Sequence, residues 1–166
     1  MQLLDSFQKK TVEAISLLQE HGYIEAMLML TFSGIDQMAW LTVTADESNG
    51  ADFRAWVKKY IDPETSLGCT AEDLWAARCG LVHTATAESR HNLKAAAKAK
   101  KVFYTTGSAK CSDNKSSDVI FINAGELVKR FMWSWLQYRL DITSDPELEI
   151  LATNKAKRIL NYVQSL

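Results

Sequence analysis

The sequence predicts a mainly α protein: a helical bundle with a small two-stranded β-hairpin insertion. Apolar residues recur at helical spacing along most of the chain, as in amphipathic helices that pack into a bundle. Hydrophobic residues make up 47% of the chain, charged residues 23%, and there are only two prolines, which is typical of a soluble globular protein. A chain of 166 residues can form one core but is short for two. We therefore expect residues 1–166 to form a single domain.

The first sixty residues predict three helices. Residues 3–21 carry apolar side chains on one face, and Gly22 follows them as a stop signal. Residues 23–44 are apolar on most sides and predict a central helix. This helix should run antiparallel to the first because the connection between them is short. Residues 52–61 predict a third helix that ends before Pro63.

A capping signal opens the fourth helix. Thr70 followed by Asp73 is a variant of the capping box, with Asp in place of the usual Glu or Gln. Further along, residues 91–101 are rich in Ala and Lys and predict a solvated helix. Residues 102–106 and 118–122 are β-branched and aromatic in character, which predicts two short strands.

The last third of the chain predicts a loop and two helices. Residues 107–117 are polar, so we expect a mobile hairpin loop or an irregular connection between the two strands. Asn123 can cap a helix that continues to about Leu140. The sequence Ser-Asp-Pro-Glu at residues 144–147 predicts the start of a final helix that reaches Leu166.

Charge and cysteine content narrow the classes of function. The formal net charge is −1, so nucleic-acid binding needs a local site and cannot be argued from overall basicity. The three cysteines lack the spacing of a disulfide framework or a zinc site, and charged residues stand near the amino terminus where a secretory segment would be apolar. The apolar stretch 24–45 is interrupted by polar residues and lacks basic flanks. We expect a cytoplasmic protein with reduced thiols, no membrane segment, no metal and no cofactor.

The most informative motif is RCGLVH at residues 78–83, which follows the helical stretch AEDLWAA. Arg78 is a permanent cation whose planar guanidinium can bind a phosphate, and His83 can transfer a proton near neutral pH. To cleave RNA without a metal, a site must take a proton from the 2′ hydroxyl, stabilise charge on the phosphate and return a proton to the leaving oxygen. The pair therefore predicts metal-independent phosphodiester chemistry.

Helix geometry sets a condition on this pair. Five positions along a straight helix turn through about 140°, so the two side chains would not normally converge. Gly80 lies between them and could permit a bend or a helix end that brings them together. Alternatively, two copies of the pair could meet across a symmetric dimer.

In these residues the chain resembles the HEPN superfamily, whose helical-bundle ribonucleases carry an Arg, then four to six residues, then a His. The resemblance implies a HEPN-like domain, metal-independent RNA cleavage with Arg78 and His83 as the catalytic pair, and a composite site in a homodimer. It also implies a toxin or anti-phage defence component, with RNA as substrate and a protein or nucleotidyltransferase antitoxin as partner. Many members have Asn or Asp directly after the arginine, where this chain has Cys79. Other members are non-catalytic, so the alternative is an interaction module that binds nucleotide, RNA or a protein partner.

Residues around the motif supply candidate supporting groups. Thr84 and Thr86 could donate hydrogen bonds to a phosphate and Arg90 could add a second cation, although the same stretch also fits a solvated loop or a helix start. Asp36 lies in an apolar helix and needs a partner, which could be the motif's Arg or His, a cap or another arginine. Cys79 stands four residues before the motif's histidine. It could be a thiolate nucleophile activated by the imidazole, or a small core residue.

One segment is basic, and the tryptophans fall at apolar helical positions. Residues 88–115 carry seven Lys or Arg and two Asp or Glu, a formal charge of 7 − 2 = +5. This segment could follow an RNA backbone or be an exposed lysine-rich helix face. Most of the five tryptophans are expected in the core. Trp133 and Trp135 are two positions apart and should point to different sides of one helix, which would place one of them at an interface.

Overall fold

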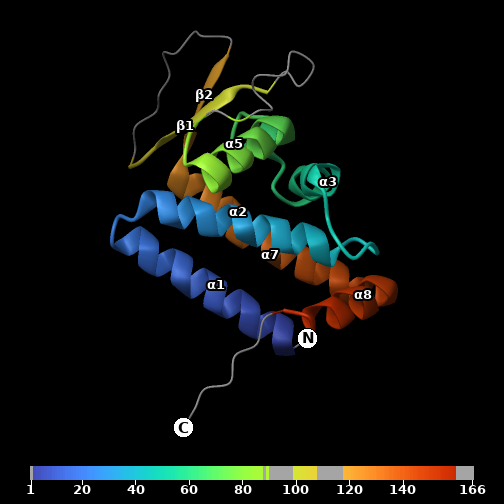
Figure 1. The fold of residues 1–166 in the computed structure, drawn as a ribbon. Coiled ribbons are helices and arrows are strands. Elements are labelled where there is room, and N and C mark those ends of the chain that lie inside the picture. The colour runs from blue at the N-terminus through green and yellow to red at the C-terminus, as the bar shows by residue number, and fades with distance from the viewer. Residues whose placement is uncertain (1, 88, 90–98, 108–117, 160–166) are drawn as a thin grey trace.

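A bundle of helices carries a small two-stranded sheet at one end (Figure 1). The structure is a computed structural model, and it describes residues 2–87, 89, 99–107 and 118–159. The mainly α class with a small β insertion is confirmed. The elements in chain order are α1 (Gln2–Glu20), α2 (Ile24–Leu41), α3 (Gly50–Tyr60), α4 (Pro63–Ser66), α5 (Ala71–Thr84), β1 (Lys101–Thr105), β2 (Val119–Asn123), α7 (Ala124–Ser144) and α8 (Pro146–Ala156).

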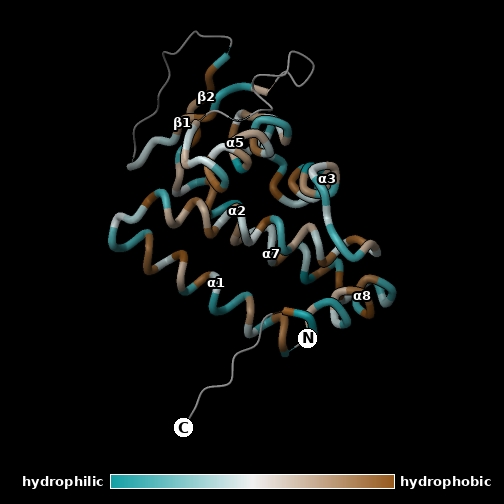
Figure 2. The backbone as a smooth tube through the Cα atoms, in the orientation of Figure 1, coloured by the Kyte–Doolittle hydropathy of each residue, from teal (hydrophilic) through white to brown (hydrophobic). Residues whose placement is uncertain are grey.

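Helix α2 lies at the centre of the bundle, as its apolar composition predicts. It contacts α1, α3, α5, α7 and α8. Helix α1 lies antiparallel beside α2, and the turn between them is at Gly22. The φ of Gly22 is +73°, in the left-handed region that glycine adopts readily. Core-facing side chains of α2 such as Phe32 and Ile35 are fully buried. Figure 2 shows how hydrophobic and hydrophilic residues alternate along the helices, as expected for amphipathic helices around one core.

Two contacts tie α2 to the carboxyl-terminal half of the chain. A Cβ added at Gly34 of α2 would stand 2.5 Å from Cζ of Phe131 on α7, so the close approach of the two helices here requires glycine. Beyond the other end of α2, the buried Lys155 of α8 donates hydrogen bonds to the carbonyl oxygens of Trp40 and Ala45, at 2.8 and 2.7 Å. The carbonyl groups at the end of a helix lack partners within it, so Lys155 acts as a cap from a distant part of the chain.

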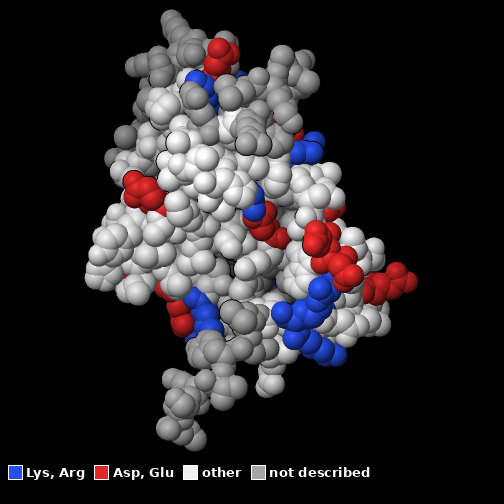
Figure 3. Space-filling view, in the orientation of Figure 1, with Lys and Arg blue, Asp and Glu red and all other residues white. Residues whose placement is uncertain are grey.

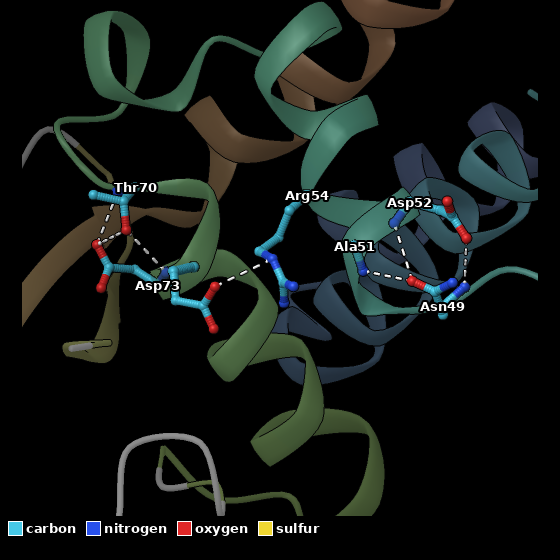
Figure 4. A network of polar contacts seen from close by, with 7 residues as sticks. Asn49, Ala51, Asp52, Arg54, Thr70 and Asp73 are labelled. Atoms are coloured by element: carbon cyan, nitrogen blue, oxygen red, sulfur yellow. Dashed lines mark hydrogen bonds and ion pairs between the residues drawn. The ribbon is translucent and has the colours of Figure 1, made fainter. Parts of the chain in front are cut away.

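Capping boxes begin helices α3 and α5 (Figure 4). In the predicted box, the Thr70 hydroxyl accepts a hydrogen bond from the backbone N–H of Asp73, and the Asp73 carboxylate accepts one from the backbone N–H of Thr70. Asn49 and Asp52 form the same arrangement before α3, which the sequence analysis did not single out. Both boxes use Asp at the position where Glu or Gln is usual, and both satisfy amide groups that a helix start leaves unpaired.

The Asp73 carboxylate also joins α5 to the sheet. Its Oδ1 accepts a hydrogen bond of 2.6 Å from the backbone N–H of Lys100, directly before β1. Asp73 is only 2% exposed, so its side chain is a buried connection between the start of α5 and the start of the strand. The neighbouring Glu72 forms an ion pair of 3.2 Å with Arg54 of α3, which links the two capped helices.

The two strands pair in parallel, which corrects the predicted β-hairpin. Each residue of β1 pairs with the residue 18 positions later, from Lys101 with Val119 to Thr105 with Asn123. A hairpin turn reverses the chain within a few residues, whereas parallel strands need a crossover of a dozen or more. The connection at residues 106–118 is long enough for such a crossover. The strand positions were correct within one residue, and the direction of pairing was wrong.

The tryptophans follow the sequence analysis. Trp56 and Trp135 are buried, and Trp40 and Trp75 pack partly buried against the core. Trp133 is 56% exposed, so it and Trp135 do point to different sides of α7. An interface at Trp133 stays a prediction.

Parts of three predicted segments lie outside the described residues. They are most of the helix at residues 91–101, most of the connection at residues 107–117, and residues 160–166. The last helix was predicted to reach Leu166, and in the structure it ends at Ala156. Helix α7 continues past Leu140 to Ser144, because the next helix begins only at Pro146. Among the described residues, no helix is both long enough and apolar enough to cross a membrane.

The two capping boxes provide a matched test of the role of Asp73. Asp73→Ala should lower the free energy of unfolding by about 2 kcal/mol, because it removes the hydrogen bonds that the buried carboxylate accepts from the amides of Thr70 and Lys100. Asp52→Ala removes only the hydrogen bond that its carboxylate accepts from the amide of Asn49 and should lower it by about 1 kcal/mol. Urea unfolding followed by far-ultraviolet circular dichroism measures both. Equal losses would contradict the bridging role of Asp73.

Candidate functional site

Helix α5 carries both residues of the motif on one continuous helix. It runs through Gly80 and ends at Thr84, so His83 lies in its last turn. The bend or helix end considered at Gly80 does not occur there. The arginine side chain spans the distance instead, because it is long enough to reach along the helix to the next turn.

Asp36, Arg78 and His83 form a continuous chain of polar contacts. Arg78 Nε donates a hydrogen bond of 2.8 Å to Asp36 Oδ2, and its Nη2 lies 2.7 Å from the same oxygen. On the other side of the guanidinium, Nη1 lies 3.0 Å from His83 Nε2. The Trp75 ring, one turn earlier on α5, lies 5.3 Å from the guanidinium carbon in a cation–π contact. Arg78 and His83 therefore contact each other within one subunit, and Asp36 joins them as a third residue of the site.

The chemistry of the two groups fixes the direction of the Arg78–His83 hydrogen bond. A guanidinium has only donors, so Nη1 donates and His83 Nε2 accepts. Acceptance at Nε2 requires the tautomer of the imidazole that carries its proton on Nδ1. His83 thus presents an acceptor nitrogen beside a fixed positive charge, which are the two properties that the proposed chemistry requires.

The three residues of this chain of contacts differ in exposure. The Asp36 and Arg78 side chains are partly buried, with 26% and 19% of their surface accessible, and His83 is exposed. Burial raises the pKa of Asp36 above its ordinary value of 3.8, and outweighs the hydrogen bond and charge of Arg78, which lower it. Arg78 is therefore held at one edge by a partly buried partner, and its other edge meets the exposed His83.

The chain turns sharply after His83. Ala85 adopts a left-handed conformation with a φ of +52°, and its N–H donates to carbonyl groups in the last turn of α5. The Thr84 hydroxyl donates to the Gly80 carbonyl at 2.8 Å and lies 2.8 Å from the Thr86 hydroxyl. Both threonines are exposed beside His83, but the Thr84 hydroxyl proton is used within the helix end. Thr84 can therefore donate to a phosphate only if this bond is exchanged.

A cavity of about 130 Å³ separates this turn from the sheet. The turn residues Ala85 and Thr86 form one side, with Leu81 of α5 below them, and Val102 and Phe103 of β1 form the other. Neither Arg78 nor His83 lines this cavity.

Cys79 fits the role of a small packing residue better than that of a nucleophile. It is half-buried, and burial raises the pKa of its thiol above 9.0 despite a hydrogen bond with Arg78 that lowers it. A nucleophilic cysteine needs the opposite shift, toward the thiolate. Cys69 is buried, with its thiol pKa raised to about 12 by burial. Arg90 and Cys111 lie outside the described residues.

Charged side chains on the described surface are mixed in sign. On the face shown in Figure 3, most lysine and arginine side chains lie beside acidic ones, in small groups. Most of the basic segment at residues 88–115 lies outside the described residues, and of its cations only Lys100 and Lys101 are placed, at the start of β1. Across the described part of the chain, no three or more His, Cys, Asp or Glu side chains are grouped so that they could hold a metal ion.

One residue of the site escaped the sequence analysis. Trp75 was predicted to lie in the core, yet its ring also makes a cation–π contact with the Arg78 guanidinium. Its position three residues before Arg78 was the available signal, since side chains at that spacing are neighbours on a helix.

No family model, curated protein or solved structure matches this chain. The function proposed below therefore follows from the residues of the site.

The Asp36–Arg78 contact makes a prediction about pH. Because the pKa of Asp36 is higher in the folded chain than its ordinary 3.8, the folded state binds this proton more tightly than the unfolded state. Its contribution to stability is fully present below pH 3.8 and is lost as the pH rises through the folded pKa. Compared with Asp36→Asn, the wild-type chain should gain stability as the pH falls from 7 toward 3.8, in urea unfolding at a series of pH values. A gain in the opposite direction would mean that the ion pair outweighs burial.

Proposed function

We propose that this chain is a metal-independent endoribonuclease of the HEPN type, with Arg78 and His83 as its catalytic pair. The observation that carries the proposal is the 3.0 Å contact between the Arg78 guanidinium and the exposed His83 imidazole. A toxin or anti-phage defence role, a homodimeric assembly and a protein or nucleotidyltransferase antitoxin as partner belong to the same proposal, since the HEPN resemblance implies them together.

The geometry supports an exchange of partners when RNA binds. A phosphate oxygen is a stronger acceptor for a guanidinium than a neutral imidazole, because it carries negative charge. The phosphate takes Arg78 Nη1, while Asp36 continues to hold Nε and Nη2. This releases His83 Nε2, which becomes free to accept a proton.

The reaction then follows from the freed acceptor. His83 Nε2 takes the proton of the 2′ hydroxyl, the O2′–P bond forms, and the P–O5′ bond breaks. Arg78 stabilises the charge that builds on the phosphate oxygens. The leaving O5′ takes a proton from a second imidazole in a homodimer or from solvent. The products are a 2′,3′-cyclic phosphate and a 5′ hydroxyl.

The direct test is cleavage of labelled single-stranded RNA in the presence of a chelator. The wild-type chain should cleave it, and His83→Ala or Arg78→Ala should lower the rate at least a hundredfold, since each removes a group that acts in the transition state. His21→Ala is the matched control, because His21 is exposed at the far end of α1 and should leave the rate unchanged. Unchanged cleavage in both motif variants would end the proposal.

A second candidate function is the non-catalytic interaction module. The observation that favours it is the engagement of Arg78 by Asp36 and Trp75, an arrangement that also serves stability. In this case Arg78 is a structural residue, and its loss leaves the partly buried Asp36 carboxylate without its partner.

The two candidates differ in what the motif variants change. For an interaction module, Arg78→Ala should lower the free energy of unfolding by about 2 kcal/mol, His83→Ala should leave it nearly unchanged, and the wild type should cleave no RNA. Urea unfolding and the cleavage assay, carried out on the same preparations, separate the candidates. Cleavage that depends on His83 would exclude the module.

A further inference from the structure

The Arg78 guanidinium meets Asp36 at a single atom. Arg78 Nε and Nη2 lie 2.8 and 2.7 Å from the same oxygen, Oδ2 of Asp36. A carboxylate that accepts with both oxygens, as two parallel hydrogen bonds, adds geometric specificity to an arginine pair. Two contacts to one oxygen act as a pivot instead, because the guanidinium can turn about that atom while both persist. The orientation of Arg78 therefore needs a further support.

The Trp75 ring supplies this support at the face of the guanidinium. The ring lies one turn before Arg78 on α5, and its centroid is 5.3 Å from the guanidinium carbon. A cation over an aromatic ring is attracted to the ring face, and the attraction is stronger where water is partly excluded. Both side chains are partly buried. Trp75 and Asp36 thus contact Arg78 at its face and at its edge, from two different helices.

Helix α3 fixes the position of the Trp75 ring. A Cβ added at Gly50, the first residue of α3, would stand 2.7 Å from Cε2 and 2.8 Å from Cζ2 of Trp75. This close approach requires glycine. One turn later on α3, the buried Phe53 ring lies 5.2 Å from the Trp75 ring between centroids. The indole therefore has no room to move toward α3.

The start of α3 is itself held against α5. A capping box begins α3, and the Arg54–Glu72 ion pair of 3.2 Å joins the two helices (Figure 4). A series of contacts therefore leads from Gly50 through Trp75 to Arg78, in addition to the contact from α2.

We propose that Trp75 is a positioning residue for Arg78, which holds the plane of the guanidinium so that Nη1 reaches His83 in the free chain and the phosphate when RNA is bound. The inference rests on the proposed function and deepens it, because a residue outside the catalytic pair controls how the pair acts. When a phosphate takes Nη1, Arg78 gives up its contact with His83 and keeps those with Asp36 and Trp75. The ring acts through Arg78 and touches no reacting atom.

The first test is the kinetics of RNA cleavage. Trp75→Leu should lower kcat about tenfold and change KM less than about twofold, because a tilted guanidinium stabilises the transition state less well. Trp75→Phe keeps a ring and should restore kcat to within about threefold of the wild type. Tyr23→Leu is the matched control, because Tyr23 is an exposed aromatic residue whose ring stacks on His21.

The second test requires no cleavage. The Nε–Hε group of Arg78 gives a signal in nitrogen–proton correlation spectra, which Arg78→Ala identifies. In Trp75→Leu this proton should exchange with water at least about tenfold faster than in the wild type, because a guanidinium that turns more freely breaks its hydrogen bond to Asp36 more often. If Trp75 only packs against the core, its loss leaves this exchange unchanged. Thermal unfolding shows that each variant is folded.

Gly50→Ala tests the link to α3 without removing the ring. The added methyl group must displace the Trp75 indole, so this variant should also lower kcat and speed up the exchange of the Arg78 proton. Combined with Trp75→Leu, it should have no further effect on either quantity, and a double-mutant cycle measures this coupling. If Trp75→Leu does not fold, Trp75→Phe takes its place in the cycle.

The outcomes separate this inference from the nuclease. If the wild type cleaves RNA through His83 while Trp75→Leu keeps both its kcat and the slow exchange of the Arg78 proton, the positioning role is wrong and the nuclease stands. If the wild type cleaves no RNA but Trp75→Leu speeds up the exchange, the nuclease is wrong and Trp75 still positions Arg78. If Trp75→Leu and Trp75→Phe lower kcat equally and leave the exchange unchanged, the ring does not act through Arg78 and the inference is overturned.

Discussion

The buried carboxylate of Asp73 is the constraint on which the rest of the site depends. One side chain accepts hydrogen bonds from the amide before α5 and from the amide before β1. It therefore fixes where the helix begins and where the strand begins relative to it. Arg78 and His83 lie further along the same helix. A carboxylate suits this task because it has enough acceptor positions to satisfy both elements at once.

A second constraint acts on Arg78, further along α5. Asp36 holds one edge of the Arg78 guanidinium, so the other edge points in one direction, toward His83 and solvent. An arginine without such an anchor would lose rotamer freedom when it binds a phosphate, whereas here that entropy is lost on folding. The cost appears as burial of the Asp36 carboxylate, whose pKa rises. The arrangement combines a structural ion pair with a prepared binding edge, which explains why the same contacts serve both candidate functions.

Local signals in the sequence predicted much of the fold, and contacts between distant segments were harder to predict. The box at Thr70 and Asp73 and the stop at Gly22 placed helix ends within one or two residues, because capping and turn chemistry are encoded in a few neighbouring residues. The pairing direction of β1 and β2 depends on the path of the connection between them, which composition does not specify. Within the site, Asp36 was expected to need a partner, but the choice of Arg78 required the packing of α2 against α5. The Arg78–His83 contact depends on a side-chain rotamer, for which helix spacing gave a misleading answer.

The hydrogen bonds from Lys155 link the order of synthesis to the completion of the fold. The carbonyl group of Trp40 accepts a hydrogen bond from a side chain 115 residues further along the chain, in the last helix that the structure describes. On the ribosome, α2 leaves the exit tunnel long before α7 and α8 exist to cover it, and its apolar surface must stay in contact with α1 or with a chaperone during that interval. A chain truncated before residue 155 would lack the lysine side chain that donates hydrogen bonds at the end of α2. We expect cellular proteases to degrade such an incompletely folded chain.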